Sequence, residues 1–154
     1  MTRPSFADWV SEVATVAESA GYSRTPLAKK LGVAEAAVLA VLDAPPAWSV
    51  PELPPGVTVR RKVGKTLQGI DVALAFCRVP DDVAALSTLV DSLPARSALW
   101  VLWPRKAGGH VSDVDENLLR SLLLPTGVVD VKAAAIDTDW SGLKFLWRKE
   151  NRPR

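Results

Sequence analysis

The segment Ala98–Trp103 reads ALWVLW, an unbroken apolar run that ends at Pro104. Two further segments are similar: Ala36–Leu42 (AAVLAVL) is also unbroken, and Ile70–Phe76 (IDVALAF) is apolar except for Asp71. Short apolar runs without polar alternation are typical of strands that are buried on both faces of a parallel sheet. These three segments therefore predict the interior strands of the fold.

Helices are predicted before and between these strands, because apolar residues recur there at helical spacing. The segments concerned are 6–17, Leu27–Leu31, Pro80–Leu93 and the one that begins near Ser112. The helix Leu27–Leu31 is expected to have the Thr25 hydroxyl as its cap, Pro26 as its first residue and Gly32 as its end.

The remaining segments predict a loop, an edge strand and a hairpin. Ala44–Gly56 holds five prolines and is expected to be an ordered crossover loop. Val57–Arg61 alternates weakly and predicts a short edge strand. Near the C-terminus, Val128–Ile136 and Leu143–Arg148 predict two strands, and the connection Asp137–Gly142 has a length that suits an antiparallel hairpin.

This order of elements predicts an α/β fold with three layers, in which helices flank a Rossmann-like mixed sheet. The sheet is expected to be mostly parallel and to end in a C-terminal antiparallel hairpin. The expected organisation is an N-terminal helix in residues 1–20, a single α/β domain in residues 21–150 and a basic tail in residues 151–154.

Composition argues against several classes of partner and site. The 154-residue chain has a formal net charge of +2, one cysteine (Cys77) and one histidine (His110). So small a charge does not indicate nucleic acid or an anionic membrane, and these residue counts exclude metal sites rich in cysteine or histidine. No apolar run is long enough to span a membrane, and the first ten residues lack the pattern of a signal peptide. We expect a soluble cytoplasmic protein without a metal.

Three stretches of the chain carry a resemblance: GYSRTPLAKKLG (Gly21–Gly32), ALWVLWPRK (Ala98–Lys106) and GVVDVKAAAIDTDWSGLKF (Gly127–Phe145). Together they resemble a family of small uncharacterised bacterial α/β proteins, a domain of unknown function with GYS-x-TPLAKKLG, LWV-x-WP-K/R-K and D-x-x-WSGL segments. The resemblance covers about Gly21 to Arg148, and it implies the fold but no activity. Where the family often has two lysines after Trp-Pro, this chain has Arg105 and Lys106.

The predicted strand order also looks like a shortened methyltransferase-type Rossmann fold. A dinucleotide or S-adenosylmethionine site in such a fold needs a glycine-rich turn after the first buried strand, so that backbone amides can approach the ligand. Here that strand is followed by Asp43-Ala44-Pro45-Pro46, a turn without glycine. We therefore expect no cofactor.

Polar residues gather at the predicted carboxyl edge of the sheet, where open α/β folds bind their ligands. Arg78 and the cations after Trp103 follow parallel strands, and the hairpin loop adds carboxylates, a hydroxyl and an indole. The candidate ligand-binding residues are Asp43, Trp103, Arg105, Lys106, Asp137, Asp139, Trp140 and Ser141. The alternative is that these are loop ends in which the aspartates cap backbone amides and Trp140 covers the core.

A helix-turn-helix is a further alternative for residues 27–42, because their apolar spacing fits that motif. In that case the recognition helix would be Ala34–Ala40, which offers alanines, one leucine, one valine and Glu35 and therefore no donor for a base edge. Specific DNA binding is not expected. The strand interpretation of Ala36–Leu42 is preferred, although alanine-rich runs favour a helix.

The leading hypothesis is a non-enzymatic module that binds a small molecule or a protein partner in the cytoplasm. The first alternative is a small transferase or hydrolase that uses the carboxyl-edge cluster. The second alternative is a DNA-binding regulator that acts through residues 27–42. No catalytic residue is assigned, because a single histidine does not define a triad.

Overall fold

The computed structural model describes residues 25–153 of the chain. The strands are β1 (Val38–Leu42), β2 (Thr58–Arg60), β3 (Val72–Phe76), β4 (Ala98–Pro104), β5 (Val128–Ala135) and β6 (Trp140–Trp147). The α-helices are α1 (Leu27–Leu31), α2 (Pro80–Ser87) and α3 (Glu116–Leu123). Single 3-10 turns are η1 (Val90–Ser92), η2 (Lys106–Gly108), η3 (Leu124–Thr126) and η4 (Lys149–Asn151).

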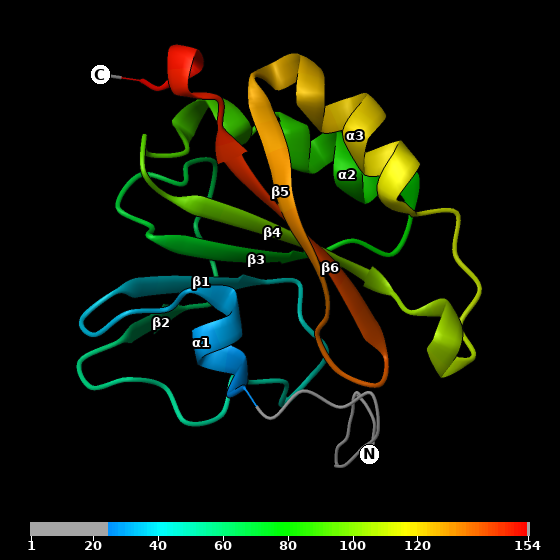
Figure 1. Cartoon of the computed structure of the whole chain (residues 1–154), viewed down its shortest axis with the longest axis horizontal. Helices are drawn as coiled ribbons and strands as arrows, with labels where there is room; N and C mark the ends of the chain where they lie inside the picture. The colour runs from blue at the N-terminus through cyan, green and yellow to red at the C-terminus, as the bar shows by residue number, and fades with distance from the viewer. Residues whose placement is uncertain (1–24, 154) are drawn as a thin grey trace. The chain divides into compact units, whose positions relative to one another are not determined.

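The strands form one mixed sheet in the order β2-β1-β3-β4-β6-β5. β1 is parallel to both β2 and β3, whereas β4, β6 and β5 are antiparallel to one another in that order. Figure 1 shows α2 and α3 on one face of the sheet and α1 on the other. The predicted three-layer α/β fold with a C-terminal hairpin is therefore confirmed.

The contacts within the chain divide it into two compact units. In the part of the chain that the structure describes, the first unit comprises Thr25, Leu102–Asp113 and Ala133–Gly142. The second comprises Pro26–Val101, Val114–Lys132 and residues 143–153.

The core of the second unit consists of the three apolar segments predicted to be interior strands. Leu39, Ala40 and Val41 of β1 are buried, as is every residue of β3. Trp100 of β4 is fully buried, and its indole N–H donates to the carbonyl oxygen of Leu31 at 3.0 Å. This hydrogen bond satisfies the only polar atom of the side chain and ties α1 to the sheet.

The helix-turn-helix alternative is wrong. After α1 the chain turns through residues 32–37, where Ala36 has a positive φ of 62°, and then enters β1 rather than a second helix. Leu39–Leu42 pair with β3 on one side, and Val38–Ala40 pair with β2 on the other. Tertiary pairing overrides the helical propensity of the alanines.

Several predicted element ends differ from those observed. Pro26 is the N-cap of α1 rather than its first residue. The helix predicted at Pro80–Leu93 begins as expected but ends at Ser87, where the Ser87 and Thr88 hydroxyls donate to backbone carbonyls three residues earlier. Such local bonds compete with helical continuation. The helix predicted near Ser112 begins at Glu116, because the carboxylate of Asp115 caps it by accepting from the Leu118 amide at 2.9 Å.

The C-terminal hairpin has a shorter loop than predicted. β6 begins at Trp140, so the loop is residues 136–139 and Trp140 and Ser141 belong to the strand. The N-terminal helix predicted in residues 1–20 lies outside the described residues. Among residues 25–153, no helix is long and apolar enough to cross a membrane.

Candidate functional site

Asp43 follows β1 at the carboxyl edge of the second unit. It is an exposed residue with a positive φ of 60°, and its carbonyl oxygen accepts from the Arg78 guanidinium at 2.8 Å. Arg78 itself follows β3, so its hydrogen bond to Asp43 links the carboxyl ends of the neighbouring strands β1 and β3. In doubly wound folds this is the position where the strand order reverses and ligands usually bind.

The proline-rich loop Ala44–Gly56 packs onto this edge. The Trp48 ring meets the Phe76 ring, at the end of β3, edge-on with 4.8 Å between ring centroids. The Trp48 carbonyl oxygen accepts from the Arg61 guanidinium at 2.8 Å, and Val50 is buried. The chain's own loop therefore packs against the end of β3, the strand next to β1.

Cys77 lies directly after β3 and is buried. The pKa of its thiol is raised to about 12, first by burial and then by the nearby carboxylates of Asp82 and Asp43. Since the thiolate is the reactive form of cysteine, this side chain is suited to packing rather than to nucleophilic chemistry.

We expect Cys77 to be inert in the folded chain. At about pH 8, where an ordinary exposed thiol reacts readily, DTNB should label it only after denaturant has unfolded the protein. Release of thionitrobenzoate, followed with and without denaturant, measures this. Rapid stoichiometric labelling of the native chain would show that the thiol is accessible and ionised, contrary to this account.

The other residues predicted for the site lie in the first unit, where two loops meet. The Arg105 amide donates to the Asp139 carbonyl oxygen at 2.7 Å. Gly108 approaches the hairpin loop so closely that a Cβ on it would collide with the Thr138 carbonyl oxygen. The segment after Trp103 and the hairpin loop are therefore held together, as predicted. Asp43 belongs to the second unit and is described with it.

The side chains at this meeting point mostly support the loops themselves. The Asp137 carboxylate accepts from the amides of Asp139 and Trp140, at 2.8 and 2.9 Å. Trp140 is buried in β6, Ser141 is half-buried beside it, and Trp103 is half-buried at the end of β4. The alternative in which Asp137 and Asp139 cap the loop amides and Trp140 covers the core therefore holds for Asp137 and Trp140, whereas the Asp139 carboxylate lies beside His110.

Three side chains of the first unit reach solvent near the loops. Lys106 is exposed, and the ring Nε2 of His110 lies 3.0 Å from the Asp139 carboxylate. Both members of this pair are substantially exposed, with 42% and 60% of their side-chain surfaces accessible. The pairing of His110 with Asp139 could not be predicted from the sequence, because the two residues are 29 positions apart.

A pocket of about 500 Å³, the amino-edge pocket, opens at the opposite edge of the sheet in the second unit. One wall is the end of α1 and the segment Ala34–Ala37 that leads into β1. Apolar side chains of the sheet also line it, and they are Val72, Ala98 and Leu146. None of its residues was among the sequence-predicted site residues.

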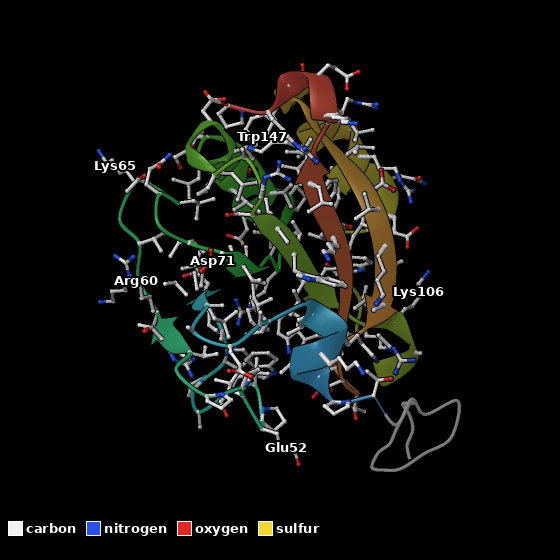
Figure 2. The ribbon with its side chains drawn as sticks, turned by 60° about the vertical axis from the view of Figure 1, so that its left-hand side comes forward. Glu52, Arg60, Lys65, Asp71, Lys106 and Trp147 are labelled. Atoms are coloured by element: carbon white, nitrogen blue, oxygen red, sulfur yellow. The ribbon has the colours of Figure 1, made fainter. Side chains whose placement is uncertain are left out.

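Four charged side chains line the amino-edge pocket: Glu35, Asp71, Arg96 and Lys144. One oxygen of the Asp71 carboxylate accepts from the Val38 amide at 2.7 Å, which fixes the side chain beside the start of β3 (Figure 2). The ammonium of Lys144 lies 3.6 Å from the position that a Cβ on Gly32 would take, at the C-terminal end of α1. The pocket therefore combines apolar surface with groups of both charges.

Comparisons with known proteins bear on the fold. No protein-family model and no curated protein matches the chain. It is similar to a solved structure described as a pericyclic reaction enzyme, with 13% identity and a TM-score of 0.50. It is also similar to LepI in complex with SAM, with 13% identity and a TM-score of 0.49. Each match covers 80% of this chain and 47% of the other, so the chain spans about half the length of these proteins.

Proposed function

We propose that this chain is a small-molecule-binding protein whose ligand occupies the amino-edge pocket. The observation that carries the proposal is the pocket's volume of about 500 Å³ together with its lining. Small-molecule sites commonly measure roughly 300–1,000 Å³ and combine apolar walls with a few placed polar groups. Val72 and Ala98 supply such walls, and Asp71 is a placed polar group.

The packing of the loops at the carboxyl edge of the sheet also supports this proposal. The turn after β1 has no glycine, and Trp48 packs on the last residue of β3. Arg78 is engaged with the Asp43 carbonyl oxygen. Because fold does not fix function, a protein with this fold can bind its ligand away from the usual cofactor position.

A small hydrolase or transferase is the second candidate function, and one observation favours it. The carboxylate of Asp139 lies 3.0 Å from the His110 ring, and a carboxylate that orients an imidazole is a common arrangement for general-base catalysis. Hydrolysis of p-nitrophenyl esters or phosphates that His110→Ala abolishes in a folded chain would favour this candidate.

The wider setting is also a proposal. On the GYSRTPLAKKLG, ALWVLWPRK and DTDWSGL stretches, the chain is a member of the small bacterial α/β family that it resembles. It acts in the cytoplasm, and its partner is a small molecule rather than a specific DNA sequence.

The binding proposal is tested by a thermal-shift panel on the full chain. The probes are amino acids, sugar phosphates, polyamines, nucleotides and S-adenosylmethionine. At least one of the first three classes should raise the melting temperature. The increase should disappear in Ala34→Trp, because Ala34 is an exposed residue of the pocket wall and the indole would fill the opening.

The matched control is Ala107→Trp, which places the same indole on an exposed residue of the first unit. This variant should keep the ligand response of the parent. The proposal fails if no probe shifts the melting temperature, or if the response survives Ala34→Trp. If S-adenosylmethionine raises the melting temperature and Ala34→Trp does not remove this response, the binding site would instead be at the carboxyl edge.

A further inference from the structure

The charges of the amino-edge pocket are separated by sign. Glu35 lies in the segment before β1, and Asp71 directly precedes β3. Arg96 lies just before β4, and Lys144 belongs to β6. The sheet order β1-β3-β4-β6 therefore places two carboxylates on one side of the pocket and two cations on the other.

None of these four side chains forms an ion pair with another residue in the described range 25–153. The carboxylate of Asp71 accepts a backbone amide through one oxygen, which leaves its second oxygen for a ligand. The pocket therefore offers charges of both signs that no ion pair within residues 25–153 neutralises.

Asp71 and Arg96 lie just before the neighbouring strands β3 and β4, so the acidic and basic sides of the pocket adjoin there. A small molecule that carries an ammonium and a carboxylate on the same carbon can contact both sides. Arg96 can hold the carboxylate through paired N–H donors, and Asp71 can accept from the ammonium. The apolar side chains of Val72, Ala98 and Leu146 then remain for an aliphatic group.

We infer, on the basis of the proposed function, that the amino-edge pocket binds a dipolar ligand of the α-amino acid class with an apolar side chain. A ligand with only negative charge would meet Glu35 and Asp71 without compensation. A ligand with only positive charge would meet Arg96 and Lys144. A ligand with both charges satisfies each side of the pocket.

The test uses leucine and two analogues that each lack one charge, N-acetylleucine and leucinamide, titrated into the full chain by calorimetry. Leucine should bind at least about tenfold more tightly than either analogue, because each analogue loses one charge-assisted set of hydrogen bonds. Variants of the pocket then show which side chain binds the carboxylate of leucine and which binds its ammonium. Arg96→Gln should weaken leucine about tenfold and leave leucinamide nearly unchanged, whereas Asp71→Asn should weaken leucine and leave N-acetylleucine nearly unchanged.

Asp71→Asn keeps an oxygen that can accept from the Val38 amide, so the loss of charge is separated from the loss of the structural hydrogen bond. Arg60→Gln, an exposed arginine of β2 outside the pocket, is the matched control and should not change the affinity for leucine.

The inference is overturned if either analogue binds as tightly as leucine, or if Arg96→Gln and Arg60→Gln have equal effects. It is also overturned if leucine does not bind while a sugar phosphate or polyamine binds in a way that Ala34→Trp abolishes. In that last case the proposed function stands and only the ligand class is wrong. If no probe responds to Ala34→Trp, the proposed function itself fails.

Discussion

Val41→Asp should destabilise the folded chain by about 3–5 kcal/mol, a large fraction of the stability of a domain of this size. Val41 is only 2% exposed and lies in β1 with strands on both sides. The new carboxylate would be taken out of water without a partner, and a protonated carboxyl would still lack hydrogen-bond partners. Urea denaturation followed by tryptophan fluorescence measures the free energy of unfolding.

The matched control is Val59→Asp, the same substitution in the edge strand β2, where the side chain is 39% exposed. Its cost should stay below about 1 kcal/mol, because the carboxylate remains hydrated. Equal losses in the two variants would mean that Val41 is not in the interior, and a parent-like Val41→Asp would contradict the position of β1.

Trp100→Ala should cost about 3–5 kcal/mol, the second-largest effect that we expect. The side chain is fully buried, and its removal leaves a cavity between α1 and the sheet in addition to an unsatisfied Leu31 carbonyl oxygen. Trp100→Phe keeps most of the packing and removes the N–H donor, so it should cost about 1–3 kcal/mol. Chemical denaturation of both variants separates the two contributions.

Trp103→Ala is the comparison within the same strand, since Trp103 is half-buried at the end of β4. Its loss should be clearly smaller than that of Trp100→Ala. If the two alanine variants unfold alike, then Trp100 does not anchor α1 as the structure indicates.

The interior strands could be predicted because a strand that is buried on both faces requires a nearly continuous run of apolar residues. β1 and β3 lie within AAVLAVL and IDVALAF, and ALWVLW forms all of β4 except Pro104; the apolar character of these segments matches the burial of the strands. The ends of elements were less predictable. They depend on single hydrogen bonds, such as the Asp115 cap of α3 or the Asp137 bonds that close the hairpin loop.

The candidate site was only partly predictable. The segment after Trp103 and the hairpin loop were expected at the same edge of the sheet, and the Arg105 amide does donate to the Asp139 carbonyl oxygen. The amino-edge pocket could not be found in this way. Its residues come from four separate segments of the chain, and only the sheet order brings Glu35, Asp71, Arg96 and Lys144 together. Asp71 carried one signal, a charge inside an otherwise apolar strand pattern.

The ligand is proposed to bind at the amino edge of the sheet and not at the carboxyl edge. The most direct measurement is the change in backbone amide chemical shifts when leucine is titrated into the isotopically labelled full chain. We predict saturable changes confined to Ala34–Ala37, Asp71–Val72 and the residues around Arg96. Changes centred on Asp43 and Arg78, changes centred on the loops of His110 and Asp139, or no saturable change at all would contradict the claim.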